Sequence, residues 1–384
     1  MGVGERLGPS GAIYTEGVTV TGEDGAGADV ILVSAGYDHT IRFWDINTGL
    51  CTRTLQHTDS QVNAMALTPN RRLVAAAGYQ HIRMYEVNSR ETAPLISYEQ
   101  ASKNVTSVGF HGEGRWMFTG GEDCTARIWD MRADTVQCSR IFQVSHPVNS
   151  VCLHPNQCEL IVGDQGGTVH LWDLRNDHNE PLILEPGISI QHIDVDSAGS
   201  QLAAVSNKGC CYIMHLISGA VLGGVSPGSG SGGGDGSVAR SPAGGGAPPT
   251  SPPRAADPAT GNPLPSSPVP ASRVTPRDKL EAHCRYALKC RFSPDSTLLA
   301  TTSADHTAVV WRTSDLSQVA TLRTEKQRWV WDCQFSADSE YLVSCSSDNA
   351  VRLWHIQEKK IEREYSGHQK PVTAIAFSDT ACDL

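Results

Sequence analysis

The fold is decided by the stretch TGGEDCTARIWD, residues 119–130, which has close copies elsewhere in the chain. The clearest copies are SAGYDHTIRFWD (34–45), VGDQGGTVHLWD (162–173), TSADHTAVVWR (302–312) and CSSDNAVRLWH (345–355). Two more lack the tryptophan: AAGYQHIRMYE (76–86), with Tyr85, and VSNKGCCYIMH (205–215), with Met214. Each copy is typical of a strand end, a tight polar turn and a second strand that ends on a large apolar residue.

The spacing of these copies predicts the architecture. The tryptophan, or the residue that replaces it, stands at positions 44, 85, 129, 172, 214, 311 and 354, and five of the six steps are 41–44 residues. A period of roughly 40–45 residues ending in Trp-Asp is typical of the four-stranded blade of a WD-repeat propeller. The seven copies therefore predict an all-β protein that is a seven-bladed β-propeller.

The one long step, 97 residues from Met214 to Trp311, contains a segment rich in Gly, Pro, Ser and Ala. Residues 223–273 include no aromatic residue, so this segment cannot bury enough apolar surface to offset its ordering entropy. We expect a disordered insertion in blade five, in the turn before the outermost strand of that blade. Such turns emerge on the face opposite the turn that contains Asp38, so the insertion should leave that face clear.

The two ends of the chain are expected to share a blade. The segment PVTAIAF (371–377) matches the first strands of the other blades but has no further strands after it, whereas VILVSAG (30–36) enters the first blade without an innermost strand. We expect the C-terminal strand to complete the first blade, because a closed ring leaves no exposed sheet edge. The propeller then spans 28–384, interrupted by the insertion, and residues 1–27 form a flexible N-terminal segment.

Composition excludes several classes of function. The 384 residues have a net charge of -10 and no basic cluster, which argues against nucleic acid as a partner. No apolar run reaches the roughly 18 residues of a membrane helix, and the N-terminus lacks the apolar region of a signal peptide. The twelve cysteines show neither zinc-ligand spacing nor a disulfide pattern. We therefore expect a soluble intracellular protein without membrane insertion, metal or other cofactor.

No catalytic motif stands out. The chain has no GxxxxGK[ST] or HExxH sequence. The turn aspartates and strand tryptophans are expected to be structural, and His283 and His368 fit turns that connect blades. We expect no enzyme and no small-molecule substrate, so that function should lie in a surface.

One end of the innermost strands changes from polar to aromatic residues. Aligned on a shared apolar residue, the position four residues earlier is occupied by Thr373, Asn63, Thr106, Asn149, Ser189, Leu288 and Trp331. Two residues before that, the row reads Pro371, Gln61, Asn104, Pro147, Gly187, Tyr286 and Trp329. Because a core would not tolerate unpartnered polar groups, both rows are placed at the rim of the central channel.

In blades six and seven both positions are occupied by large apolar residues instead of small or polar ones. Two tyrosines, Tyr37 and Tyr79, are expected in turns on the same face. Trp and Tyr are enriched at interface hot spots, which predicts a partner-binding site here. Its residues are Tyr37, Gln61, Asn63, Tyr79, Tyr286, Leu288, Trp329 and Trp331. The alternative is that the aromatic side chains fold over the channel mouth as a local plug.

Longer stretches resemble one WD-repeat family, the G-protein-β-subunit-like subunit of the target-of-rapamycin (TOR) kinase complexes. The resemblance rests on stretches such as AAAGYQHIRMYE, CLHPNQCELIVGDQ, RYALKCRFSPDSTLLAT and REYSGHQKPV, and it covers 30–384 except the insertion. Met214 departs from it, since the family usually carries Trp there. The resemblance implies a non-catalytic subunit that binds and stabilises the C-lobe of the TOR kinase domain in both TOR complexes. It also implies a cytoplasmic protein, recruited to lysosomal or other endomembrane surfaces through the kinase complex.

Two alternatives remain open. The segments WDMR (129–132) and WDLR (172–175) match the WDxR motif of substrate receptors for cullin-type ubiquitin ligases. The second alternative is that the protein is a generic scaffold with an unrelated partner. The insertion also contains a PxxP pattern from Pro249 and Ser-Pro or Thr-Pro steps, which are candidate sites of polyproline binding or phosphorylation; an inert tether is the simpler interpretation.

Overall fold

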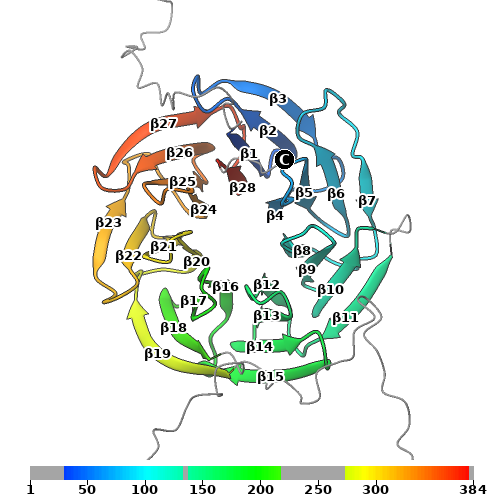
Figure 1. Cartoon of the computed structure of the whole chain (residues 1–384). Coiled ribbons are helices and arrows are strands. Elements are labelled where there is room, and N and C mark those ends of the chain that lie inside the picture. Colours follow the sequence, from blue (N-terminus) through cyan, green and yellow to red (C-terminus); the bar gives the residue numbers. More distant parts are fainter. Residues whose placement is uncertain (1–29, 133–136, 218–272, 380–384) are drawn as a thin grey trace, which may run out of the picture.

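The computed structural model describes residues 30–132, 137–217 and 273–379, in which the regular elements are all β-strands. Seven four-stranded antiparallel sheets form blades around a central channel (Figure 1). The predicted all-β, seven-bladed propeller is therefore confirmed. The predicted N-terminal segment 1–27 lies outside the described residues. So does the predicted insertion 223–273, except that its last residue, Arg273, already belongs to a strand.

Each blade has four strands, which follow one another from the channel outward. Blade one has β28 (Val372–Ser378), β1 (Ile31–Gly36), β2 (Thr40–Trp44) and β3 (Cys51–Gln56); blade two has β4 (Ala64–Leu67), β5 (Leu73–Ala77), β6 (Ile82–Glu86) and β7 (Ile96–Tyr98). Blade three has β8 (Val105–Phe110), β9 (Trp116–Gly121), β10 (Thr125–Asp130) and β11 (Cys138–Gln143); blade four has β12 (Val148–Leu153), β13 (Glu159–Asp164), β14 (Thr168–Asp173) and β15 (His178–Ile183). Blade five has β16 (Ile190–Val195), β17 (Gln201–Ser206), β18 (Cys210–Ile217) and β19 (Arg273–Glu281); blade six has β20 (Ala287–Phe292), β21 (Leu298–Ser303), β22 (Ala308–Arg312) and β23 (Gln318–Leu322). Blade seven has β24 (Val330–Phe335), β25 (Tyr341–Ser346), β26 (Ala350–His355) and β27 (Lys360–Ser366).

The C-terminal strand completes the first blade, as predicted. Strand β28 pairs antiparallel with β1 from Ile31 opposite Ser378 to Gly36 opposite Val372. The chains approach so closely at Gly36 that a Cβ there would lie 2.1 Å from the carbonyl oxygen of Pro371. Closure of the ring therefore depends on the absence of a side chain at this position.

The predicted structural role of the Trp, Asp and turn His residues is also confirmed. In blade one, the indole N–H of Trp44 donates to Ser34 Oγ at 2.7 Å, and this hydroxyl lies 2.7 Å from His368 Nε2. The other ring nitrogen of His368 lies 2.8 Å from Asp38 Oδ2, which links the two strands and the blade-connecting turn.

Blade six repeats this chain of hydrogen bonds with Trp311, Thr301, His283 and Asp305, at distances of 3.0, 2.9 and 3.0 Å. Burial of the Asp305 carboxyl opposes its ionisation, but hydrogen bonds from His283 and Thr307 outweigh burial and hold its pKa well below the usual value. The turn that contains Asp305 is thus joined to the loop that contains His283 by a charged, hydrogen-bonded group.

Side chains pack between neighbouring blades and form the core. Trp129, Trp172 and Trp354 are among the largest fully buried side chains, and Trp129 meets Tyr98 of blade two at a ring distance of 5.4 Å. Tyr85 and Met214, which replace the repeat tryptophan, are buried in the same way. Position in the repeat, and not the indole itself, fixes this core site.

Candidate partner-binding face

The eight predicted site residues lie on one face of the propeller. We call it the top face: it contains the starts of the seven innermost strands and the turns between the second and third strands of each blade. We call the opposite side of the propeller the bottom face. At this side of blade five, Ile217 at the end of β18 pairs with Arg273 at the start of β19, so the chain leaves the blade there. Ile217 and Arg273 bound the segment that contains the predicted insertion, which, apart from Arg273 itself, lies outside the described residues.

Three of the predicted residues form one aromatic cluster, which consists of Tyr37, Trp329 and Trp331. The two indoles lie 5.6 Å apart between ring centroids, tilted by 48°, and Trp331 meets Tyr37 of blade one edge to face at 6.4 Å. Val330 between the tryptophans is fully buried, while Trp329 and Tyr37 are 37% and 39% exposed. The cluster therefore joins blades seven and one and presents aromatic surface to solvent.

The two tryptophans have different environments. Trp331 is half-buried against the core shared by blades seven and one, and its indole N–H donates to Ser347 Oγ at 2.6 Å. Trp329 is more exposed, and its backbone carbonyl accepts the amide hydrogen of Ser347 at 2.9 Å. Trp331 therefore covers the core between blades seven and one, while Trp329 keeps more of its side chain in solvent.

The polar residues near the starts of the innermost strands have a structural role that the sequence alone does not show. In several blades the polar residue is the extra residue of a β-bulge near the start of the innermost strand, as at Thr106 and Asn149. Thr373, Thr106 and Asn149 donate to carbonyl oxygens of the next blade, those of Val62, Val148 and Ile190, at 2.6 to 2.7 Å. Asn63 makes a longer bond of 3.3 Å to Val105. These four bonds fasten neighbouring blades, so Asn63 is partly committed to structure.

The alignment of blade five was wrong by two residues. Its bulge falls between Ile190 and His192, so Gln191, not Ser189, occupies the position equivalent to Trp331. Ser189 in turn occupies the position equivalent to Trp329, which the sequence alignment had assigned to Gly187. The error came from the anchor residue, because the sequence alignment counted back from Ile193, whereas the strand pairing makes Val195 the equivalent of Phe335.

The remaining predicted residues flank the aromatic cluster. Tyr286 is 54% exposed, and its carbonyl accepts bonds from Ala304 and Ser303 of blade six, while Leu288 is the half-buried bulge residue of β20. In blade two Tyr79 is 48% exposed and Gln61 is half-buried. Within the described residues, no ring contact joins Tyr286 or Tyr79 to the aromatic cluster.

Sequence reasoning missed five cations in the loops that precede the innermost strands of blades six, seven and one. All are exposed and lie in loops that lead into β20, β24 and β28: Arg285, Arg323, Lys326, Arg328 and Lys370. A search for basic runs does not find them, because they come from three loops far apart in the chain. The sequence does contain one signal that could have found them: Arg285 and Arg328 each stand directly before an exposed aromatic residue.

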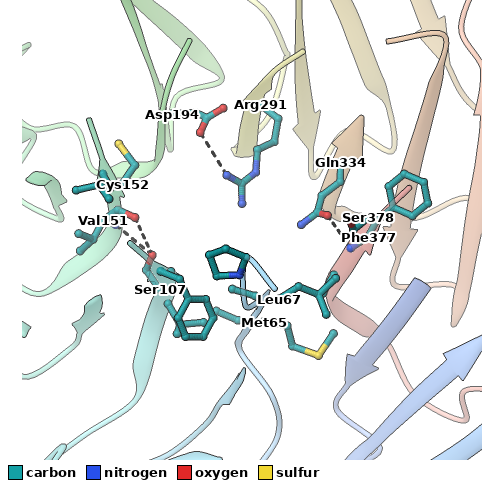
Figure 2. Close-up of a pocket in the computed structure, with 18 of the residues that line it drawn as sticks. Met65, Leu67, Ser107, Val151, Cys152, Asp194, Arg291, Gln334, Phe377 and Ser378 are labelled. Atoms are coloured by element: carbon teal, nitrogen blue, oxygen red, sulfur yellow. Dashed lines mark hydrogen bonds and ion pairs between the residues drawn. The ribbon is translucent and has the colours of Figure 1, made fainter. Parts of the chain in front are cut away.

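A cavity of about 750 Å³ lies at the end of the channel on the bottom face, lined mainly by the last residues of the innermost strands. Figure 2 shows side chains from the innermost strands of several blades lining it, with Arg291 directed at Asp194 at 3.3 Å. Phe292 N–H donates to Asp194 Oδ2, and Phe377 N–H donates to Gln334 Oε1, both at 2.8 Å. These contacts join neighbouring blades, five to six and seven to one.

The WDxR arginines are engaged within their own turns. Arg132 donates to Asp130 through both Nε and Nη2, and Arg175 binds Asp173 in the same way at 3.0 and 2.9 Å. These contacts account for the two motifs as structure, and none of the findings supports the ubiquitin-ligase alternative. In the part of the chain that the structure describes, no cluster of three metal-ligating side chains occurs and no helix could span a membrane.

Comparison with known proteins agrees with this architecture. The family model "WD domain, G-beta repeat" matches residues 23–45, 49–86, 93–130, 136–173, 274–312 and 316–355. Over 358 residues the chain is 50% identical to "Target of rapamycin complex subunit LST8" of Mus musculus, which covers 91% of this chain and 95% of that protein. The protein of the same name in Saccharomyces cerevisiae is 40% identical over 351 residues, 91% of this chain and 99% of its own length. "Target of rapamycin complex subunit LST8-1" of Arabidopsis thaliana is 36% identical over 301 residues, 78% of this chain and 82% of that protein. The resemblance predicted from the sequence is confirmed: the chain belongs to the LST8 family of WD-repeat proteins.

Proposed function

We propose that this chain is a non-catalytic subunit of TOR kinase complexes whose top face binds the C-lobe of the kinase domain. The relatives from Mus musculus and Saccharomyces cerevisiae are named as subunits of the target of rapamycin complex. The C-lobe is the partner that the family resemblance implies. The observation that carries the site is the aromatic cluster, in which the exposed Trp329 contacts Trp331, and Trp331 contacts Tyr37.

The geometry suits an interface hot spot. Aromatic side chains supply a large contact area, and their contribution is greatest when they are held in place before binding. Ser347 bonds to both tryptophans, one through its hydroxyl and one through its amide, so the partner meets a surface that is already ordered. Binding at this surface would also stabilise the C-lobe, because a ligand that binds only the folded state shifts its unfolding equilibrium.

The test is co-purification of the full chain with the TOR kinase. Trp329→Ala should weaken binding by roughly tenfold or more, as loss of a central aromatic hot spot does. It should also lower the thermal stability that the chain confers on the kinase. Trp116→Ala is the matched control, since Trp116 is half-buried at the opposite end of its blade, where β9 begins.

Circular dichroism and urea unfolding should show that both variants remain folded. Normal kinase binding by a folded Trp329→Ala/Trp331→Ala double variant would reject the assignment of the site. Absence of TOR kinase among proteins purified with the wild-type chain would reject the function itself.

A further inference from the structure

The three loops that contain the five cations carry a charge opposite to that of the whole chain. These basic loops are 282–286, 323–329 and 367–371, which lead into β20, β24 and β28. They hold five Arg or Lys residues and a single carboxylate, Glu325, in a chain of net charge -10. The other four loops of this kind, 57–63, 99–104, 144–147 and 184–189, hold three carboxylates and only one lysine, Lys103. Positive charge is therefore concentrated in blades six, seven and one.

The five cations are free within the described part of the chain. None of their side chains forms an ion pair or hydrogen bond there, although many other arginines of the protein are paired. The turn aspartates of these blades pair with other residues and not with the five cations. Asp38 contacts His368, Asp305 contacts His283, and Asp348 contacts Arg352 at 2.5 Å.

The basic loops adjoin the aromatic residues of this face. Arg328 precedes Trp329 directly, Arg285 precedes Tyr286, and Lys370 precedes Pro371, whose carbonyl accepts the amide hydrogen of Tyr37 at 3.0 Å. Uncompensated charge around an apolar centre is the arrangement in which rim electrostatics steer a partner and fix its orientation.

We propose that the partner element docked on the aromatic cluster is acidic: an apolar anchor flanked by Asp or Glu side chains that face Arg285, Lys326, Arg328 and Lys370. This inference rests on the proposed function and specifies the chemistry of the docking element on the kinase. The aromatic cluster supplies affinity, and the basic loops supply association rate and orientation.

A protein partner fits this surface better than single-stranded nucleic acid does. Base stacking needs open ring faces, whereas Trp331 is half-buried and Trp329 is tilted against it. The other loops of the same face are acidic and would repel a phosphate backbone that continued across the face.

The experiment measures association of the full chain with purified TOR kinase at 50, 150 and 300 mM KCl. The triple variant Arg285→Glu/Lys326→Glu/Arg328→Glu should associate roughly tenfold more slowly at the lowest salt, and its rate should lose most of its salt dependence. The control Lys103→Glu/Lys208→Glu reverses two exposed lysines on the same face, outside the basic loops, and should change the rate little.

The outcomes separate this inference from the proposed function. If Trp329→Ala abolishes binding but the triple variant binds with wild-type rate and salt dependence, the acidic docking element is wrong and the proposed function stands. If neither variant affects binding, the proposed site is wrong as well. If the triple variant instead loses binding to vesicles of anionic phospholipid or to single-stranded RNA while kinase association is unchanged, the basic loops serve another ligand and the inference is overturned.

Discussion

Ser347 accepts the indole hydrogen of Trp331 at 2.6 Å, and this single bond sets the orientation of the ring that supports Trp329. The Ser347→Ala variant keeps the backbone bond to Trp329 but leaves a half-buried indole N–H without its partner. We expect a loss of about 1 kcal/mol in the free energy of unfolding and a kinase affinity between those of wild type and Trp331→Ala. Urea unfolding and a binding titration measure the two effects.

Ser347→Thr is the matched control, because it keeps a hydroxyl at the same position. It should restore both quantities to near the wild-type values. Equal losses in the alanine and threonine variants would show that the hydroxyl does not order Trp331.

Ring closure depends on the last strand. Deletion of residues 367–384 removes β28, including Val372, Ala374 and Ile375, which are fully buried, and it also removes His368. We expect an insoluble or poorly folded chain, because β1 and the facing edges of blades seven and two lose their packing. Solubility and the cooperativity of urea unfolding are the measurements.

A shorter deletion, of residues 380–384, retains all of β28 and provides the control. It should leave solubility and cooperativity as in the full chain. A soluble, fully cooperative product of the longer deletion would contradict the closure scheme.

The histidine-aspartate pairs should contribute measurably to stability. Asp305→Ala leaves the buried ring of His283 without its carboxylate partner, which should cost about 1–3 kcal/mol in the free energy of unfolding. Asp38→Ala should behave alike, since His368 makes the same contact. Asp315→Ala, in an exposed turn, should cost little, and a loss at Asp305 no larger than this control would argue against the structural role.

Blade two replaces the Trp–hydroxyl–His–Asp chain with two histidines in contact. His57 Nε2 lies 3.0 Å from His81 Nε2, and His57 Nδ1 lies 3.2 Å from the hydroxyl of Tyr85. Burial, with smaller contributions from His81, Arg83 and His39, lowers the pKa of His57 to about 3, although Asp59 partly opposes this shift.

The sign of the resulting pH dependence follows from this lowered pKa. Above the unfolded value of about 6.5 the contribution is nil; below it the unfolded chain binds a proton that folded His57 does not, so stability falls as the pH falls. We expect a loss of about 2 kcal/mol at pH 5 from this residue. Urea unfolding at pH 7 and pH 5 should show a smaller loss in His57→Gln than in wild type; equal losses would exclude His57 as the cause.

Much of the fold was predictable because it repeats. The Trp-Asp copies give the number of blades, and their spacing identifies Tyr85 and Met214 as members of the series even without the indole. The lone segment 371–377 similarly predicts closure, since a blade needs an innermost strand.

The hydrogen bonds that join neighbouring blades were not predictable from the sequence. The alignment of blade five was anchored on Ile193 and therefore placed Ser189 at the position of Trp331, whereas the strand pairing makes Val195 the equivalent apolar residue and Gln191 the bulge. The bond from Thr106 to the carbonyl of Val148 joins residues 42 positions apart, and nothing in the local sequence marks it. The position of the polar row could thus be predicted, but its purpose depends on contacts with the neighbouring blade.

The candidate site was predictable in part for a related reason. Trp329 and Tyr286 stand out against small or polar residues at equivalent positions, whereas the exposed cations look ordinary in each loop taken alone. Their meaning comes from three loops brought together by the ring.

The pairing of β1 with β28 also sets the order in which the protein can be completed. Ser34 and His368 are separated by 334 residues, so blade one is the first to be synthesised and the last to be finished. Until the ribosome releases the C-terminal strand, β1 presents an unpaired edge beside a growing arc of finished blades. We therefore expect nascent chains to be held by a molecular chaperone through most of translation, and folding to be limited by the capture of this final strand.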